Sequence, residues 1–353
     1  MSDRTPASGL LRSCGSAIVP RAHAAHRRLG APPARQRGIA LLVAILLVAL
    51  GTIIAVAVAY DNAMTARRGA ATLSFDEAIL IGQGAEALAA YGIQASWQQD
   101  KNNVFASQPW AMPVGPLEIV PGVMLDASIE DLSGRFNLNS LLKEDTTGTL
   151  VVDPVAQAAL VNLLEKAGIE SKWAGYIIDW IDPDIAPQTP DGAEDTVYMG
   201  QTPPYLTANQ YITSTTELLA LPGFGRDRYN KIAPYITALP PDAKVNVCTA
   251  PGEVLDMFLA PGRQDWGGQN ADQLLKNRQG ASGCFPQITK DYQPTFDGAN
   301  FAKASQEFAQ TSKYFRLTSH ITIGTTEFNL YSLLYREDSN GTVRAIQRSY
   351  SPD

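Results

Sequence analysis

The chain has 353 residues, 45% of them hydrophobic and 18% charged, and its 35 acidic side chains outnumber 28 basic ones to give a net charge of −7. An acidic surface disfavours binding to nucleic acid, so we expect no partner of that class. Two of the three histidines lie in an N-terminal segment of 38 residues that is predicted to be a leader, and His320 is the third. Catalytic arrangements that need histidine are therefore restricted to this one residue.

The first 38 residues form a basic segment rich in proline and alanine. They contain seven arginines and one aspartate, and they show no apolar periodicity. This composition predicts a disordered leader, and the positive-inside rule places it in the cytoplasm. Without the leader, the chain keeps 21 basic and 34 acidic side chains.

An uncharged apolar stretch of 22 residues follows, from Ile39 to Tyr60. As a helix it would be about 33 Å long, enough to cross the hydrocarbon core of a bilayer. A secretory signal has a shorter apolar region and ends at a small-residue cleavage site. The stretch is therefore predicted to be a single membrane span that stays on the protein.

Gly38 stands directly before Ile39, with Arg35 and Arg37 upstream. This arrangement resembles the site cut by prepilin peptidase in type IV pilins and in the pseudopilins of type II secretion. The resemblance implies that the peptidase cuts after Gly38, that Ile39 becomes the methylated first residue, and that the apolar helix stays on the mature protein. It also implies that this helix holds the protein in the inner membrane by a single span, with the C-terminal bulk in the periplasm. The alternative is an uncleaved signal anchor that holds a periplasmic enzyme or binding protein.

Val43 occupies the fifth position after Gly38, where pilin-like proteins usually carry glutamate. A carboxylate in hydrocarbon is costly unless it is paired. In a filament it is thought to pair with the N-terminal ammonium of a neighbouring subunit, and a subunit with nothing above it needs no such group. Absence of the glutamate is characteristic of one group of minor pseudopilins, the general secretion pathway protein K family.

Beyond the membrane, the sequence predicts that the helix continues to about Ile93. One apolar stripe supports it, formed by Leu73, Leu80, Ala87, Leu88 and Tyr91. A separate helix after a break at Gly69 is the alternative. Residues 117–129 then predict two strands around a turn at 120–122. Residues 313–349 predict three more strands, with turns at Gly324 and 338–341. Alternation places His320 on a polar strand face, so we expect no catalytic role for it.

The segment between these strands has helical patterns. Asp153 followed by Pro154 predicts a helix start, and short helices are expected within 172–181, 213–221, 226–239 and 250–260. Residues 215–236 resemble a DNA-binding helix-hairpin-helix, but an exported acidic chain favours a plain helical hairpin. We therefore predict an α+β, type IV pilin-like fold, in which a long N-terminal transmembrane helix packs on an antiparallel sheet and a large all-helical domain is inserted. The expected boundaries are 1–38 (leader), 39–60 (membrane span), 61–140 (pilin-like, first part), 141–285 (insertion) and 286–353 (pilin-like, C-terminal part).

Five short motifs resemble the protein K family and follow its order. They are SGRFNLN (133–139), DWIDPD (179–184), DGAED (191–195) together with Tyr198, ELLALPGFG (217–225) and KVNVCTAP (244–251). The resemblance implies a minor pseudopilin at the tip of the type II secretion pseudopilus that initiates or caps its assembly, without enzymatic activity. Its implied partners are the I-type and J-type minor pseudopilins, the major pseudopilin and prepilin peptidase.

Six acidic side chains lie between Asp179 and Asp195, a stretch of seventeen residues that contains no lysine or arginine. Either an open, solvated loop or a hard cation such as Ca²⁺ could accommodate them, and the spacing is not that of an EF-hand. The residues leave both possibilities open, whereas the protein K resemblance implies calcium. The expected ligands are Asp182, Asp184, Asp191, Glu194 and Asp195, with Asp179 as a helix residue or a support behind them.

Cys248 and Cys284 are the two cysteines outside the leader, which contains Cys14. An even pair in an exported chain predicts a disulfide. A zinc site is the weaker alternative, because no second pair and no histidine lie nearby in the sequence.

Overall fold

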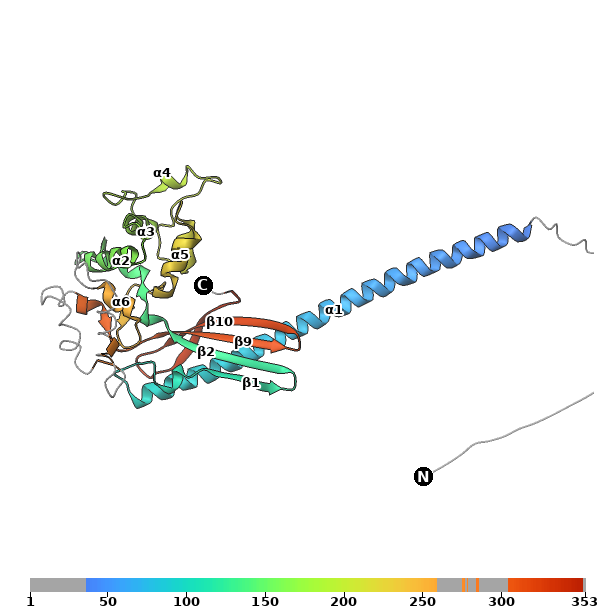
Figure 1. The fold of residues 1–353 in the computed structure, drawn as a ribbon, viewed down its shortest axis with the longest axis horizontal. Coiled ribbons are helices and arrows are strands. Elements are labelled where there is room, and N and C mark those ends of the chain that lie inside the picture. Colours follow the sequence, from blue (N-terminus) through green and yellow to red (C-terminus); the bar gives the residue numbers. More distant parts are fainter. Residues whose placement is uncertain (1–35, 259–274, 277, 279–283, 286–303, 352–353) are drawn as a thin grey trace, which may run out of the picture. The chain divides into compact units, whose positions relative to one another are not determined.

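The computed structural model describes residues 36–258, 275–276, 278, 284–285 and 304–351 (Figure 1). Residues 1–35 of the predicted leader (1–38) lie outside this described part of the chain. Contacts between residues divide the chain into two units, Met1–Arg68 and Gly69–Asp353, which are described separately.

In the first unit, the described residues belong to helix α1, whose full range is Gln36–Gln99. Every side chain from Ile39 to Tyr60 is exposed. Among the described helices, α1 is the one long and apolar enough to span a bilayer. A helix that is apolar all round is suited to lipid rather than water, in agreement with a membrane span. The predicted continuation of the helix past the membrane is confirmed, since α1 extends beyond Ile93.

The second unit contains a five-stranded antiparallel sheet. Its spatial order is β1 (Val114–Val120), β2 (Val123–Asp131), β9 (Tyr314–Ile323), β10 (Thr326–Arg336) and β11 (Val343–Ser349). Both predicted strand regions are confirmed, and β2 pairs directly with β9 although most of the second unit separates them in sequence. With α1 packed on this sheet, the predicted pilin-like fold is present (Figure 1).

The C-terminal part of α1 packs on the sheet through small residues. Ala78, Ala85 and Ala89 are buried there, and Gly82 lies so close that a Cβ would be 2.5 Å from Leu330 Cδ2. Small side chains allow the helix axis to approach the sheet closely. The predicted apolar stripe therefore lies on the other face of α1, with 61–73% exposure for its large members, Leu73, Leu80, Leu88 and Tyr91.

Short helices predominate between β3 and β8. The α-helices with described bounds are α2 (Pro154–Lys166), α3 (Trp173–Ile181), α4 (Asp195–Tyr198), α5 (Gly225–Ile232) and α6 (Gly252–Met257). The 3₁₀ turns with described bounds in the second unit are η1 (Pro109–Ala111), η2 (Leu132–Gly134), η3 (Leu138–Leu141), η4 (Thr215–Ala220), η5 (Ala233–Tyr235) and η7 (Ser305–Glu307). The predicted cap is confirmed, because the Asp153 side chain accepts from the Val155 and Ala156 N–H groups.

The expectation of an all-helical insertion needs one addition. Three two-stranded ladders accompany the helices: β3 (Phe136–Asn137) with β6 (Ile236–Thr237), β4 (Leu142–Glu144) with β5 (Leu150–Val152), and β7 (Val245–Asn246) with β8 (Phe308–Ala309). These ladders are two or three residues long, too short for alternation to reveal them in a sequence.

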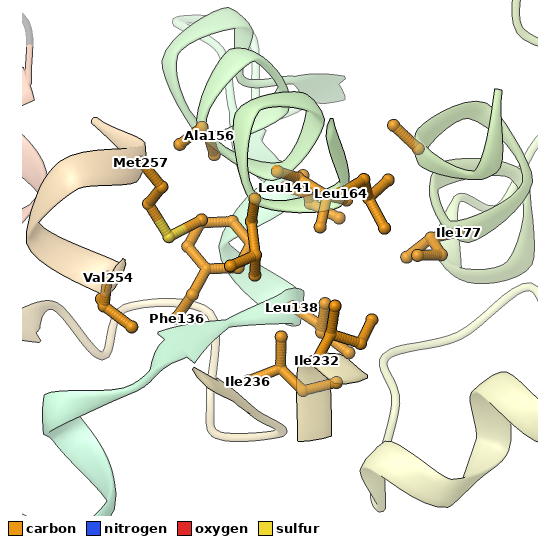
Figure 2. Packing of buried hydrophobic residues seen from close by; sticks show 14 of the residues in the cluster. Phe136, Leu138, Leu141, Ala156, Leu164, Ile177, Ile232, Ile236, Val254 and Met257 are labelled. Carbon is orange, nitrogen blue, oxygen red and sulfur yellow. The ribbon is translucent and has the colours of Figure 1, made fainter. Parts of the chain in front are cut away.

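The helical segment has its own apolar core. Phe136 and Leu138, from the SGRFNLN motif, are fully buried among Ile177, Ile232 and Met257 (Figure 2). Motif residues that resemble the family thus hold several helices together.

A buried polar network joins the ends of the segment. Asp131 Oδ2, at the end of β2, accepts hydrogen bonds from Asn246 Nδ2 (3.0 Å), Thr249 Oγ1 and Ser312 Oγ (both 2.5 Å). Asn246 Nδ2 also donates to Val104 O at 2.9 Å. Burial raises the pKa of Asp131, although these hydrogen bonds oppose the shift. The network is called the root network below.

Candidate metal centre

Three acidic side chains meet in the helical segment. Oxygen atoms of Asp179, Asp182 and Glu194 lie within 4.8 Å of one another. Their exposures are 0%, 4% and 5%, so all three are buried. Asp179 is in the last turn of α3, Asp182 caps that helix, and Glu194 precedes α4. These residues are called the acidic cluster.

The loop after α3 folds back toward that helix, because the Asp179 side chain accepts hydrogen bonds from the backbone of the loop. Asp179 carboxylate oxygens accept from the N–H groups of Gln188 (3.1 Å and 3.2 Å) and Ala193 (2.6 Å). The close approach requires glycine at 192, where a Cβ would lie 2.4 Å from Asp179 Oδ2. The DGAED motif is thus shaped to bring Glu194 back to α3.

The cluster lacks neutralising partners among the described residues. Both carboxylate oxygens of Glu194 and Oδ1 of Asp182 are buried without a hydrogen-bond partner. Burial, followed by the charge of Asp184 and then of Asp179, raises the pKa of Asp182 to about 7. Burial, with the neighbouring carboxylates adding to it, likewise raises the pKa of Glu194 to about 7. Burial also raises the pKa of Asp179.

Buried oxygen atoms without donors fit a hard cation. A buried charge is stable only if it is paired, protonated or bound to a metal. Ca²⁺ prefers carboxylate and carbonyl oxygens and tolerates irregular loops. The buried carboxylate oxygens of the acidic cluster therefore suit bound Ca²⁺ better than they suit an open, solvated loop.

The five predicted ligands do not all lie in the cluster. Asp182 and Glu194 belong to it. Asp184 is exposed and accepts from the Ala186 N–H at 2.7 Å, but its charge still acts on the cluster. Asp191 is also exposed. Asp195 Oδ1 accepts from Thr207 N (3.0 Å) and Thr207 Oγ1 (2.7 Å).

Three further residues lie in or beside the cluster, and none of them is among the five predicted ligands. Asp179, expected as a support, contributes an oxygen to the cluster itself. The hydroxyl of Tyr198 and Oδ1 of Asn209 are buried without a hydrogen-bond partner in the described part of the chain. Burial raises the pKa of Tyr198, and Asp179 and Glu194 add to the shift. The spacing of acidic residues carries no signal for either neutral side chain.

The other predicted positions have simpler outcomes. Cys248 and Cys284 form the predicted disulfide, with 4.7 Å between their Cα atoms. His320 is exposed on β9, as expected, and its Nδ1 lies 2.6 Å from Asn329 Oδ1. Gly38 and Ile39 lie within α1, and cleavage between them stays a prediction.

Comparisons with known proteins identify the family. The profile of "Type II secretion system (T2SS), protein K" matches residues 134–241. Type II secretion system protein K of Klebsiella pneumoniae is 32% identical over 321 residues, which cover 90% of this chain and 97% of the relative. The protein K of Pseudomonas aeruginosa is 30% identical over 322 residues, covering 89% and 92%.

A solved structure supports the fold. The crystal structure of the GspK-GspI-GspJ complex from enterotoxigenic Escherichia coli contains a chain that matches with a TM-score of 0.68 and 23% identity, covering 81% of this chain and 100% of that chain. The sequence relatives extend over nearly the whole chain, on a pilin-like fold. The chain therefore belongs to the type II secretion system protein K family, whose members are minor pseudopilins.

Proposed function

We propose that this minor pseudopilin occupies the tip of the type II secretion pseudopilus, where it initiates or caps the filament during protein export across the outer membrane. The observation that carries the proposal is Val43. No carboxylate occurs anywhere from Ile39 to Tyr60. A shaft subunit would need a carboxylate there to pair with the N-terminus of a neighbour, but a tip subunit has no subunit above it.

The proposed partners are minor pseudopilins of the I and J types, with the major pseudopilin below them. The solved relative is a complex of GspK with GspI and GspJ, and we extend that partnership to this chain. The outer face of α1 is a suitable contact surface. Leu73, Leu80, Leu88 and Tyr91 are largely exposed, and such an apolar face favours burial against a neighbouring helix.

Processing is part of the proposal. Prepilin peptidase would cut between Gly38 and Ile39 and leave a methylated Ile39 at the start of the membrane helix. The basic leader supports a cytoplasmic N-terminal side and a periplasmic C-terminal bulk. A periplasmic enzyme or binding protein on an uncleaved anchor is not favoured, given the family to which the chain belongs.

The proposed role is structural rather than catalytic. His320 is exposed on the sheet and bound to an amide oxygen, an environment typical of a surface strand residue. The acidic cluster is buried, which suits a site that stabilises the fold more than one that admits a substrate.

Calcium completes the proposal. We assign Ca²⁺ to the acidic cluster, held by Asp179, Asp182 and Glu194, with Asp184, Asp191 and Asp195 as further candidates from the same loop. Bound Ca²⁺ would supply the positive charge that the buried carboxylates lack and would fix the loop between α3 and α4. The support is the set of unpartnered carboxylate oxygens in the cluster.

The tip assignment can be tested by quantitative labelling of pseudopili. We expect about one copy at one end of each filament, and shorter or more numerous filaments when the protein is overproduced. Val43→Glu should give no gain in assembly and should lower membrane insertion, at a cost of about 2–3 kcal/mol, whereas Val43→Ala is the matched control. Label distributed along the shaft, or longer filaments on overproduction, would refute the tip position.

Mass spectrometry of the membrane-extracted protein tests processing separately. A mass that begins with N-methylated Ile39 supports the pseudopilin route. A chain that still begins with the leader residues would instead support the uncleaved anchor.

A further inference from the structure

An apolar pocket lies between α1 and the edge of the sheet that β1 forms. Small residues of α1, namely Ala85, Ala89 and Gly92, line it from the helix, and the buried side chains of Leu125 and Leu317 line it from the sheet. Its volume is about 120 Å³. The pocket lies entirely within the second unit and is called the α1 pocket.

The lining of the α1 pocket suits an apolar occupant. Every described side chain that lines it is apolar, and the ring nitrogen of Trp110 donates to Gln108 Oε1 at 2.8 Å. A cavity of about 150 Å³ with an aliphatic lining stays dry and can hold a benzene ring. A pocket of slightly smaller volume therefore accepts one aliphatic side chain, such as that of leucine or methionine. Filling it restores contacts that the lining atoms lack when it is empty.

Exposed apolar side chains surround the mouth of the α1 pocket. Leu88 of α1 is 61% exposed, Met112 is 64% exposed, and Val114 of β1 is 46% exposed. Leu88 also belongs to the exposed apolar face of α1, with Leu80 and Tyr91, that we propose as a contact surface for neighbouring pseudopilins. The pocket is thus a hollow at the margin of that face, within reach of a partner that packs on α1.

The sheet edge beside the pocket is unsuited to an added strand. β1 contains Pro116, which has no backbone N–H to donate, and its register against β2 is irregular at two places within Val114–Val120. Proline and bulges on an edge strand disfavour pairing with a further strand. A helix that presents side chains therefore fits this edge better than a strand that presents backbone groups.

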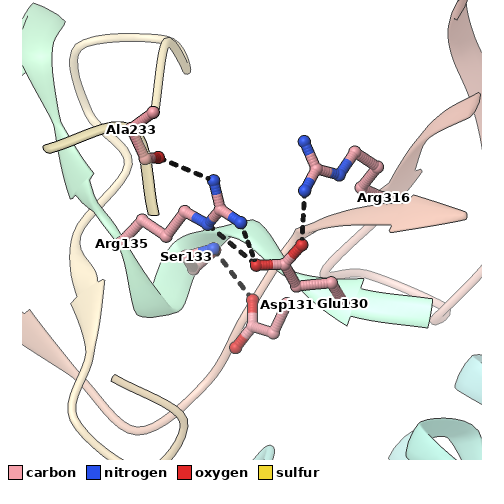
Figure 3. Close-up of polar contacts among 6 residues, drawn as sticks. All are labelled: Glu130, Asp131, Ser133, Arg135, Ala233 and Arg316. Atoms are coloured by element: carbon pink, nitrogen blue, oxygen red, sulfur yellow. Dashed lines mark hydrogen bonds and ion pairs between the residues drawn. The ribbon is translucent and has the colours of Figure 1, made fainter. Parts of the chain in front are cut away.

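The other face of the sheet has a partner within the chain. Glu130 of β2 accepts from Arg135 Nε at 2.8 Å and from Arg316 Nη2 at 2.6 Å (Figure 3). Arg135 Nη1 also donates to Ala233 O of the helical segment at 3.1 Å. The helical segment thus joins that face of the sheet, whereas the mouth of the α1 pocket remains accessible to another protein.

We propose that the α1 pocket receives one large aliphatic side chain from the N-terminal helix of a neighbouring minor pseudopilin, of the I or J type. Helices pack by placing side chains of one into gaps between side chains of the other. Ala85, Ala89 and Gly92 follow one another at about one turn along α1 and leave such a gap. A large side chain buried in a pocket contributes more to an interface than the exposed contacts around it. The inference rests on the proposed function for the identity of the neighbour, and it adds the point of attachment.

The test measures binding of the full chain, in detergent micelles, to its own full-length I-type and J-type pseudopilins, added singly and together. Gly92→Leu places an aliphatic group inside the pocket. A Cβ at position 92 would lie 3.9 Å from Trp110 Cα, an ordinary contact, and the helix gains propensity when glycine is replaced. We therefore expect an unchanged or higher Tm and an affinity that falls by about tenfold or more.

Gly92→Ala is the matched control, because it adds the Cβ and the helix propensity without filling the pocket. It should change the affinity by less than about twofold. Equal losses of affinity from Gly92→Leu and Gly92→Ala, or no loss from either, would overturn the inference.

Photo-crosslinking locates the contact independently and decides the question if Gly92→Leu lowers the Tm. A p-benzoylphenylalanine in place of Met112, at the mouth of the pocket, should crosslink to the apolar N-terminal helix of the neighbour, as mapped by mass spectrometry. The same group in place of Ile346, on the opposite edge strand β11, should not reach that helix. Crosslinks from position 112 to a second copy of this chain, to a strand of the partner, or to no protein would overturn the proposed occupant.

Leu80→Gln separates this inference from the proposed function. Leu80 lies on the exposed face of α1 but does not line the pocket, so its substitution tests that contact face alone. A weaker complex with Leu80→Gln and a normal one with Gly92→Leu would overturn the pocket while leaving the contact face in place. Failure of the unsubstituted chain to bind either pseudopilin would overturn both.

Discussion

Two buried acidic regions of the second unit meet opposite electrostatic conditions. At the junction of α1 and the sheet, Glu86 accepts from Arg348 Nε and Nη2, both at 2.7 Å, and from Ser332 Oγ at 2.6 Å. Burial alone would raise the pKa of Glu86, but these hydrogen bonds and the charge of Arg348 outweigh it and hold the pKa below its usual range. In the acidic cluster, burial acts on Glu194 without such partners, and its pKa rises to about 7.

Similar burial thus has opposite consequences. Glu86 is 7% exposed and Glu194 is 5% exposed, so desolvation alone does not separate them. The difference is the cation: Arg348 supplies one within the chain at the first site, whereas the second site must take one from solution or bind protons. The α1–sheet junction should therefore be stable without added ions, and the helical segment should respond to them.

The largest expected effect comes from removing Arg348, which supplies the positive charge beside Glu86. Arg348→Met leaves the Glu86 carboxylate buried without its partner, and we expect a loss of about 3 kcal/mol in the free energy of unfolding. Arg344→Met, at an exposed position of the same strand, should cost about 1 kcal/mol or less. Chemical denaturation of both variants checks this. Equal losses would mean that Arg348 contributes no more than a surface arginine.

The next effect is the response to calcium. At a Ca²⁺ concentration about 100-fold above its dissociation constant, binding to the folded state stabilises by about 2.7 kcal/mol, and the Tm should rise by about 5–10 °C relative to chelated protein. Glu194→Gln should remove most of this rise, whereas Glu165→Gln, an exposed acid on α2, should keep it. A Tm that does not change between chelator and millimolar Ca²⁺ would mean that the carboxylates of the acidic cluster bind protons rather than Ca²⁺.

A smaller effect is expected in acid. Because the folded-state pKa of Glu86 lies below its unfolded value of about 4.5, its contribution to stability is complete above that pH and is lost as the pH falls through the folded-state pKa. Glu86→Gln should therefore flatten the acid limb of the stability curve below about pH 4.5. Denaturation at a series of pH values, with and without the substitution, measures the difference. Parallel acid limbs would show that other carboxylates dominate.

The smallest effect separates the exposed acids from the buried ones. Asp184→Asn and Asp191→Asn each remove a charge from the loop without opening the cluster, so we expect Ca²⁺ affinity to fall by about tenfold or less. Calorimetric titration of each variant measures the dissociation constant. A loss as complete as that caused by Glu194→Gln would make the exposed acid a principal ligand.

Much of the fold follows from local patterns in the sequence. Asp153 and Pro154 mark the start of α2, and alternation marks β9 and β10 with the turn at Gly324 between them. These signals need only a few consecutive residues. The insertion was visible because helical patterns interrupt two groups of strand patterns.

The packing face of α1 could not be predicted in the same way. Hydrophobic periodicity selects large apolar residues, but the sheet contacts Ala78, Gly82 and Ala85, whose value lies in their small size. The pairing of Glu86 with Arg348 was also invisible, since 262 positions separate the two residues.

The candidate site was predicted in composition but not in arrangement. The density of acids identified the loop. Which carboxylates turn inward depends on Asp179 binding the backbone of Gln188 and Ala193, and that closure is a property of the folded loop. Asp179 therefore contributes an oxygen to the acidic cluster, while Asp184 and Asp191 lie exposed.

The root network also bears on the order of folding. Asp131 and Ser312 hydrogen-bond across 181 positions, so β2 cannot pair with β9 until a very long loop has closed. Closure entropy opposes that step, and contacts between distant residues form slowly. A helical segment that has already collapsed shortens the effective loop. Pulsed hydrogen exchange should therefore protect α2 and α3 before β9, with the central strand pair of the sheet completed last.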